Sequence, residues 1–234
     1  MTGILAALDA TWPAASQRVV GGWRVREGQG GGKRVSSATA EDPTAAGGIA
    51  QAEAAHAALG QEPLFCLRDG QEDLDRALVA RGYRIVDPVV LLAAPLVAMA
   101  AEPPAHMTSF PLWPPLAITR DLWAEGGIGA ARQAVMERVA VPKISILGRT
   151  GDRAAGAAFV ALHDGIAVVH ALHVDPAARR QGLARNLMRA AAAWALGQGG
   201  HTLALAVTKA NAPALALYAA LGMERVGQYH YRAR

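Results

Sequence analysis

The segment V-D-P-A-A-R-R-Q-G-L-A, residues 174–184, constrains this chain more than any other part of the sequence. It follows an apolar run rich in β-branched residues, 166–174, and precedes a run with helical character. A strand, a short loop and a helix form a cradle for phosphate, because the helix N-terminus offers unpaired N–H groups and a positive dipole end. Gly182 lets a ligand approach the backbone, and Arg179 and Arg180 supply fixed positive charge. We therefore expect an anionic ligand at this loop.

The composition indicates a chain with a large apolar core and no disulfide. Apolar residues make up 52% and charged residues 18% of the 234 residues, which suffices for one large or two small domains. Cys66, the only cysteine, lies between apolar neighbours, and we interpret it as a core residue. A chain without disulfides suits a reducing compartment, so we expect a cytoplasmic location.

Neither export nor membrane insertion is predicted. The N-terminus lacks the basic start and long apolar region of a signal peptide. The most apolar run, residues 89–101, contains Pro95 and is shorter than the roughly 20 residues of a membrane helix. The net charge of +4 suits an anionic ligand or a nucleic acid, but no long run of basic residues is present, so nucleic-acid binding ranks lowest. No group of histidine, cysteine and carboxylate residues has metal-site spacing, so we expect no metal.

Two halves of the chain are similar and are separated by a proline-rich segment, residues 101–115, which we interpret as a linker. Each half contains a strand, a helix, a glycine that stops the helix, and a second strand. In the second half these fall at 203–207, 212–221, Gly222 and 225–231. In the first half they fall at 64–67, 71–81, Gly82 and 84–92. The stop glycines stand 140 positions apart, which predicts an internal duplication and two similar α/β domains.

The first copy lacks the residues that carry the chemistry. Its counterpart of the phosphate loop has two alanines and a glycine, residues 45–47, where the second copy has its paired arginines, and Leu78 stands where the second copy has Tyr218. We infer a degenerate first domain that supports, covers or dimerises, and a working second domain. The glycine-rich stretch 28–32 is expected to be a flexible hairpin between strands 19–26 and 33–39, and not a phosphate loop.

The second half has a defined order of expected elements: a helix over 126–139, antiparallel strands over 144–149, 154–163 and 166–174, then helix, strand, helix and strand. Three sequence features occur in this order: Arg179-x-x-Gly182-x-Ala184, Asn211, and Ala216-Leu217-Tyr218-x-x-Leu221-Gly222-Met223. With these features, residues 116–234 resemble the GNAT family of acetyl-CoA-dependent N-acetyltransferases. Met223 departs mildly from the family, which usually has phenylalanine there.

The resemblance implies a fold and a domain organisation. The fold class is α/β, with tandem GNAT-like domains, each a mixed, mostly antiparallel twisted sheet flanked by helices. Residues 1–100 would form the degenerate N-terminal domain, 101–115 the linker, and 116–234 the catalytic domain.

The resemblance also implies acetyl-CoA as cosubstrate and assigns residues to it. The pyrophosphate would lie on N–H groups from Arg180 to Arg185, the thioester carbonyl near the N–H of Val174, and the pantetheine arm or the loop near Asn211. The expected cofactor-binding residues are Leu172, His173, Val174, Arg179, Arg180, Gln181, Gly182, Leu183, Ala184, Arg185 and Asn211. Tyr218 would protonate the departing thiolate, since a phenol with a pKa near 10 is protonated at neutral pH. The alternative is that Tyr218 packs in the core.

An acceptor amine must lose a proton, and His170 is the candidate base. The resemblance puts it where many family members have a glutamate, and an imidazole with a pKa near 6.5 can take a proton. The alternative is a structural histidine with both ring nitrogens satisfied. Strand periodicity predicts that His170 and His173 face opposite sides, with His170 on the face of Leu172 and Val174.

The function implied is transfer of an acetyl group from acetyl-CoA to a primary amine of a small molecule or peptide, by direct attack. The alternative is a non-catalytic acyl-CoA-binding sensor of the same origin. No nucleic-acid or membrane partner is expected, and a homodimer is compatible with the sequence. Trp113 and Trp123 are candidates for the acceptor pocket, although packing is the commoner role of such residues. Fold and cofactor leave the acceptor amine open.

Overall fold

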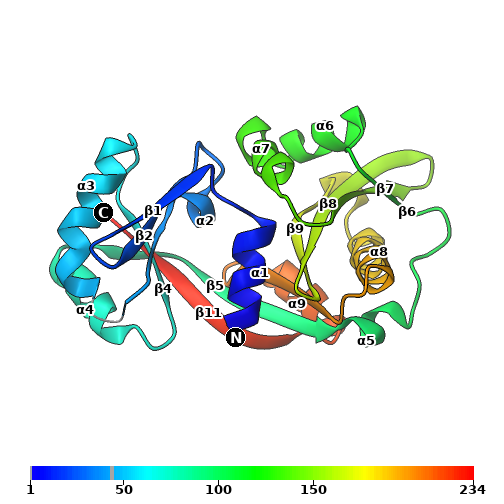
Figure 1. Cartoon of the computed structure of the whole chain (residues 1–234). Helices are drawn as coiled ribbons and strands as arrows, with labels where there is room; N and C mark the ends of the chain where they lie inside the picture. Colours follow the sequence, from blue (N-terminus) through cyan, green and yellow to red (C-terminus); the bar gives the residue numbers. More distant parts are fainter. Residues whose placement is uncertain (1, 43–44) are drawn as a thin grey trace.

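The computed structural model describes residues 2–42 and 45–234, and one sheet of eleven strands runs through both halves (Figure 1). The strands are β1 (Ser16–Val20), β2 (Trp23–Glu27), β3 (Ala38–Ala40), β4 (Leu64–Arg68), β5 (Arg84–Pro95), β6 (Ser109–Leu112), β7 (Lys143–Thr150), β8 (Arg153–His163), β9 (Ile166–Val174), β10 (Thr202–Thr208) and β11 (Glu224–Ala233). The helices are α1 (Thr2–Thr11), α2 (Lys33–Ser36), α3 (Ile49–Ala58), α4 (Glu72–Ala80), α5 (Leu96–Ala100), α6 (Ala117–Glu125), α7 (Ala130–Arg138), α8 (Leu183–Gly197) and α9 (Ala212–Ala220). Short 3-10 turns, η1 (Ala45–Gly48) and η2 (Pro176–Ala178), precede α3 and α8. In the part of the chain described, no helix has the length and apolar character to cross a bilayer.

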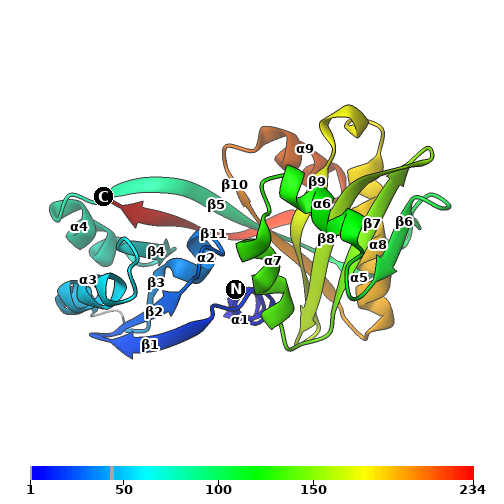
Figure 2. The ribbon, with the colours of Figure 1, turned by 90° about the horizontal axis from the view of Figure 1, so that it is seen from above.

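The two halves exchange their last strands. The strand order is β1-β2-β3-β4-β11-β5-β10-β9-β8-β7-β6. The last strand of the chain, β11, pairs with β4 of the first half, and β5 of the first half pairs with β10 of the second. Figure 2 shows these two long strands crossing from one half to the other. The predicted boundary at 101–115 therefore separates two stretches of sequence that share one sheet.

The order of elements recurs in the two halves, which supports the predicted internal repeat. Helices α4 and α9 begin 140 positions apart, as do β5 and β11. Each helix is followed by a glycine with positive φ, 84° at Gly82 and 74° at Gly222, a conformation that suits glycine at a helix end. In the first half the parallel strands β3 and β4 precede and follow α3 in the sequence. In the second half the parallel strands β9 and β10 precede and follow α8 in the same way.

Four expectations about individual elements were wrong. The predicted helix 126–139 is the shorter α7, which begins only at Ala130 because glycines precede it, and α6 before these glycines was not predicted. Part of the predicted linker forms β6, which pairs with β7 at the sheet edge. The predicted strand 19–26 is a hairpin, β1 and β2, that turns at Gly21 and Gly22. The predicted strand 33–39 is mostly the short helix α2.

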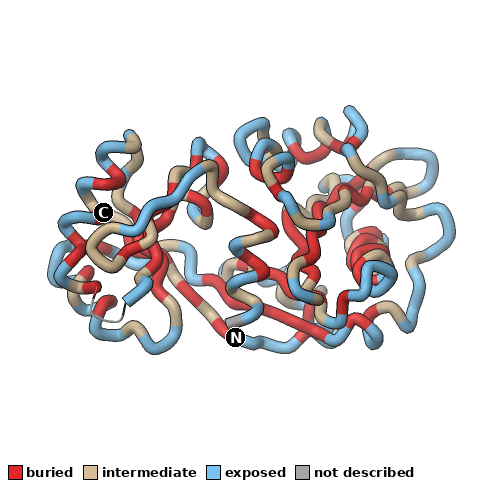
Figure 3. The backbone as a smooth tube through the Cα atoms, in the orientation of Figure 1, coloured by how far each residue is buried: buried red, intermediate tan, exposed pale blue. Residues whose placement is uncertain are grey.

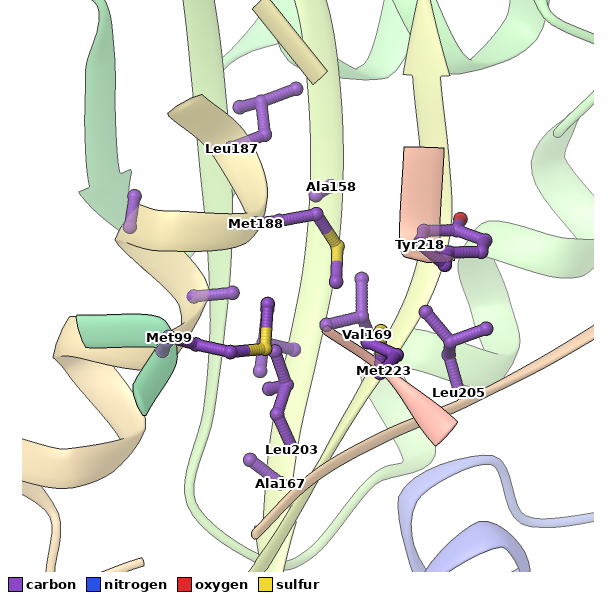
Figure 4. Packing of buried hydrophobic residues seen from close by; sticks show 14 of the residues in the cluster. Met99, Ala158, Ala167, Val169, Leu187, Met188, Leu203, Leu205, Tyr218 and Met223 are labelled. Carbon is purple, nitrogen blue, oxygen red and sulfur yellow. The ribbon is translucent and has the colours of Figure 1, made fainter. Parts of the chain in front are cut away.

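The second half of the sheet is covered on both faces. Helices α5, α8 and α9 cover one side, here called the α8 face, where Leu187 and Met188 of α8 share one buried cluster with Ala158 and Val169 of the sheet (Figure 4). Helices α1, α6 and α7 cover the other side, here called the α1 face. The burial trace in Figure 3 shows the buried segments following the sheet through both halves. Cys66 is buried under α1, which confirms its assignment to the core, and burial raises the pKa of its thiol to about 11.

One ion-pair cluster holds the exchanged strand β11 to the first half. Asp75 of α4 accepts hydrogen bonds from Arg232 Nε at 2.7 Å and Nη2 at 2.6 Å. His230 Nε2 lies 2.8 Å from the same carboxylate. The hydrogen bonds from Arg232 lower the pKa of the Asp75 carboxyl, and those from His230 lower it further. Arg232 is buried, so its charge depends on this partner.

We predict that Asp75→Asn lowers the free energy of unfolding by about 2 kcal/mol at pH 7, because a buried guanidinium loses its bidentate partner. A carboxyl whose pKa is lowered by folding stabilises the fold above its unfolded pKa, near 3.9, and stops doing so as pH falls. The difference in free energy of unfolding between parent and variant, measured by urea titration, should therefore become smaller below about pH 4. Asp73→Asn, on the exposed side of the same helix, is the control. Equal stability of Asp75→Asn and Asp73→Asn at pH 7 would contradict the prediction.

Candidate active site

The sheet opens between β9 and β10. These parallel strands pair only where Ile166–Val168 meets Thr202–Ala204, and they separate beyond that point. A bulge in β9 lies where they part: its register with β8 shifts by one residue, and Ala171 has a φ of 51°. The Trp123 indole N–H donates to the Ala171 carbonyl at 2.9 Å, which holds the bulge from α6. The backbone edge of β9 after the bulge is thus left without its neighbouring strand.

The bulge changes which side chains share a face, and the prediction for the two histidines was wrong. His170 lies opposite Phe159 of β8, and His173 lies opposite Ala157. Because those two β8 residues are two positions apart, both histidines lie on the α1 face. Leu172 and Val174 instead pack with the core under α8. The extra residue inserted by the bulge reverses the alternation that the sequence predicts.

A cavity of about 600 Å³ passes through this opening. Leu205 and Val207 of β10 line it and belong to the core on the α8 face, whereas Ala206 between them packs on the α1 face. The cavity therefore connects the two faces of the sheet. Its lining on the α8 face includes Tyr218 and, where α9 begins, Asn211; on the α1 face it includes Trp12, Arg34 and His170. This volume is in the range of small-molecule sites.

The predicted phosphate loop is open and has free amides. Arg180 and Gly182 both have left-handed backbone, with φ of 64° and 83°, and α8 begins directly after them. The first backbone bond of the helix runs from Asn186 N–H to the Gly182 carbonyl at 3.1 Å, so the amides of residues 180–185 have no intrahelical partner. Arg180 is exposed. These groups lie at the carboxyl end of β9, the same sheet edge as Asn211 at the end of β10, because the two strands are parallel.

Other predicted loop residues have structural contacts of their own. Arg179 Nε donates to the Val174 carbonyl at 3.1 Å, which ties the loop to the strand. Gln181 Nε2 donates to the Ala177 carbonyl at 3.3 Å. Leu183 is buried in the core under α8. The side chains available to an anion in this loop are therefore fewer than the sequence predicts.

The first-half counterpart of this loop is closed. A Cβ at Gly48 would lie 1.8 Å from the carbonyl oxygen of Gly21 in the β1–β2 turn, whereas a Cβ at Gly182 would meet no atom within 4 Å. The hollow beside the first-half loop is lined by Glu41, Glu72 and Asp73, among others, and this acidic lining disfavours a phosphate. Of the two loops, only the one in the second half is open to an anion.

Tyr218 and Asn211 both line the cavity. The Tyr218 ring is buried beside Val169 and Leu205 and lines the cavity (Figure 4). Burial raises the pKa of its phenol to about 12, so the group is protonated at neutral pH. The Asn211 side-chain carbonyl accepts the Ala214 N–H at 3.2 Å and caps α9, which leaves its NH₂ group to face the cavity.

His170 is fully engaged. Its Nδ1 lies 3.1 Å from an Arg34 Nη, and its Nε2 lies 2.9 Å from Thr11 Oγ1. A guanidinium can only donate, so Nδ1 is the acceptor and Nε2 carries the proton. The Thr11 hydroxyl donates its own hydrogen bond to the Ala7 carbonyl at 2.6 Å, so it accepts the one from His170. Burial, and then the charge of Arg34, lower the pKa of His170 well below 6.5. This geometry disfavours the predicted base role and favours a satisfied structural histidine.

His173 has more freedom. It is half-buried on the same face and abuts Gly126, where a Cβ would lie 2.3 Å from its Nδ1. No hydrogen bond joins its ring to another residue in the ranges described. Burial, and then the charge of Arg179, lower its pKa below 6.5, so it is neutral at pH 7. Gly126 lines the cavity, and His173 contacts Gly126 without itself being part of the lining.

Sequence reasoning missed the wall that the first half contributes. The cavity is lined by Trp12, Gly31 and Arg34 from the N-terminal segment and by Arg132 from α7. The glycine-rich stretch 28–32 forms this wall and is not a flexible hairpin: a Cβ at Gly31 would lie 2.6 Å from Val135 of α7. The run of glycines was the available signal, since close backbone packing requires it. Trp123 is fully buried, which confirms packing as its role.

We predict that His170 keeps its Nε2–H tautomer from pH 8 to pH 5, because protonation would set an imidazolium against the Arg34 guanidinium inside the fold. Ring ¹⁵N chemical shifts measured across this range report the tautomer. The histidines of the urea-unfolded chain, which titrate near pH 6.5, are the reference. Protonation of His170 above pH 6 in the folded protein would contradict the assignment.

Comparison with known proteins supports the reading of the second half. Residues 120–223 match the sequence profile of the Acetyltransferase (GNAT) family, a range that holds the open loop, Asn211 and Tyr218. The chain is 24% identical over 234 residues to the "uncharacterized N-acetyltransferase YobR" of Bacillus subtilis, covering 96% of this chain and 95% of that protein.

Two solved structures share the fold. A GCN5-related N-acetyltransferase from Kribbella flavida superposes with a TM-score of 0.76 at 21% identity, covering 99% of this chain and 94% of that one. A tandem GNAT protein from the clavulanic acid biosynthesis pathway gives a TM-score of 0.63 at 14% identity, covering 91% and 77%. In the described ranges, no three potential metal-ligating side chains come together.

Proposed function

We propose that this chain transfers an acetyl group from acetyl-CoA to an amine through the opening between β9 and β10. The observation that carries the proposal is the cavity lined by Asn211 and Tyr218 on the α8 face and by Trp12, Arg34 and His170 on the α1 face. The open loop at residues 180–185 lies at the same sheet edge as Asn211, because β9 and β10 are parallel. The GNAT match over residues 120–223 supports it. In this arrangement the donor occupies the α8 face and the acceptor approaches from the α1 face.

The loop suits the diphosphate of CoA. Free amides before α8 and the left-handed turn at Gly182 form an anion cradle, and Arg180 adds a charge that no described carboxylate neutralises. Beyond the loop, the unpaired edge of β9 from Leu172 to Val174 offers N–H groups to the thioester carbonyl. The Asn211 NH₂ group is available to the pantetheine arm.

The reaction needs a proton donor and a proton acceptor. As the amine nitrogen bonds to the thioester carbon, negative charge develops on the carbonyl oxygen beside the β9 edge. Collapse breaks the C–S bond, and the Tyr218 phenol donates its proton to the departing thiolate. A non-catalytic sensor would have no use for a buried phenol at this point, which favours the enzyme over that alternative.

We assign the proton acceptor to His173 in place of His170. The basic nitrogen of His170 is occupied by Arg34, whereas His173 is neutral at pH 7 and its ring is unengaged. It lies on the α1 face, from which the acceptor approaches, and it contacts Gly126 of the cavity lining. It receives the ammonium proton directly or through a water molecule.

The first half serves the acceptor side. Its own loop is closed at Gly48 and faces acidic groups, so it does not bind a second CoA. Its N-terminal segment instead supplies the wall at Trp12, Gly31 and Arg34. We propose that it is a degenerate copy of the second half that now shapes the acceptor site.

Two variants should show that acetyl-CoA binding and catalytic turnover depend on different residues. Arg180→Gln removes a charge from the phosphate cradle and should raise the Kd for acetyl-CoA about tenfold by isothermal titration. Tyr218→Phe should leave that Kd unchanged and lower kcat by roughly 100-fold. Arg84→Gln, an exposed arginine at the start of β5 in the first half, is the charge-matched control. Absence of acetyl-CoA binding by the parent protein would overturn the proposed function.

The pH profile should identify the base. In the parent protein, kcat should fall as pH drops through a pKa below 6.5, because His173 becomes protonated and can no longer accept a proton. His173→Gln should flatten this acidic limb and lower kcat about 100-fold at pH 7. The His170→Gln variant should retain the acidic limb of the kcat profile. The His201→Gln variant, which changes an exposed histidine outside the site, should retain it as well. A limb that survives in His173→Gln and disappears in His170→Gln would reverse the assignment.

A further inference from the structure

We propose that the acceptor amine carries an anionic group, a carboxylate or a phosphate, which Arg34 and Arg132 bind on the α1 face of the cavity. The proposal rests on the acetyl transfer proposed above and names the class of its acceptor. Both arginines line the cavity, one from α2 in the first half and one from α7 in the second. The site therefore exists only because the two halves meet there.

Neither of these two arginines forms a salt bridge with a described residue, although the more distant Asp9 acts on Arg34. No carboxylate among the described residues lies within ion-pair distance of either one. Other cations near the cavity are neutralised: Lys33, which also lines it, pairs with Asp87 at 2.6 Å. Arg26, close to α1, pairs with Asp9 at 3.3 Å. A cavity wall with two unpaired guanidinium groups selects for an anion.

Arg34 is held in place by His170, and at least one of its N–H donors has no hydrogen-bond partner within the described part of the chain. One Nη is fixed on His170 at 3.1 Å, and His170 is in turn stacked on Trp12 with ring centroids 4.9 Å apart. Its Nε is shielded from water and has no hydrogen-bond partner. Such a donor costs free energy in the absence of a ligand. The histidine thus acts as a positioning residue that orients the guanidinium.

Arg132 brings a second positive charge close to the first. Burial, and then the charge of Arg34, lower the pKa of the Arg132 guanidinium. The neighbouring group that offsets this is the Tyr231 phenol, and not a carboxylate. Two like charges held across a cavity repel, and an anion between them removes the repulsion.

This anion is distinct from the phosphates of CoA. Arg34 contacts His170, whereas the phosphate loop begins after Val174, four residues further along β9, or about 13 Å of extended strand. The loop also leads into α8 on the opposite face of the sheet. The two arginines have a second effect on the acceptor: fixed positive charge disfavours an ammonium and favours the neutral amine that attacks.

Matched amines test the proposal. The pairs are β-alanine and its amide, glycylglycine and its amide, and O-phosphoethanolamine and ethanolamine. Each is titrated calorimetrically into the full-length protein, and kcat/KM is measured with acetyl-CoA. We expect an anionic member to bind at least tenfold more tightly than its neutral partner and to react faster. The carboxylate and phosphate arms show which anion the site takes.

Variants locate the site. Arg132→Gln changes a partly covered guanidinium that makes no hydrogen bond or ion pair among the described residues, and it should reduce the preference for the anion about tenfold. Arg34→Lys keeps the charge and loses the planar fork, and should reduce it less. Arg84→Gln, at an exposed position in the first half, should retain the full preference. Equal binding of both members of every pair, or a preference that survives in Arg132→Gln, would overturn the proposal. Acetyl-CoA titration of the same samples keeps this result separate from the proposed function, which fails only if the donor does not bind.

Discussion

The separation of β9 from β10 is the constraint on which the rest of this site depends. Two parallel strands that remained paired would close the sheet and leave no path between its faces. The bulge at Ala171 parts them, and the Trp123 indole satisfies the carbonyl that the bulge exposes. The same displacement brings His170 and His173 to one face and leaves the β9 edge free. Backbone geometry of a single residue thus sets which groups meet a donor and which meet an acceptor.

Exchange of β5 and β11 explains why both halves contribute to one site. Since each half completes the sheet of the other, the N-terminal segment is held against α7 and its glycine-rich stretch becomes a wall. The first half has a closed loop and an acidic hollow where the second has an open loop and arginines. After a single duplication, the first half could lose its own donor site and still gain a role as a wall of the acceptor site.

Local features were predictable from sequence, whereas the pairing of distant segments was not. The strand–loop–helix around Gly182 and the helix cap at Asn211 follow from residue types and spacing, and the structure has both elements. The faces of His170 and His173 were mispredicted because period-two alternation assumes a strand without a bulge. The role of Arg34 depends on a partner 136 positions away, His170, which no local pattern indicates. Partner choice for β5 and β11 likewise depends on register across the whole sheet.

Hydrogen–deuterium exchange with and without acetyl-CoA tests the central claim, that the donor occupies the loop before α8 and the opened edge of β9. The account predicts slower exchange at the amides of residues 180–185 and along 171–174 when acetyl-CoA is added. It predicts no change at the first-half counterpart, residues 45–50. Protection of that first-half loop, or unchanged exchange at residues 180–185 under saturating acetyl-CoA, would contradict it.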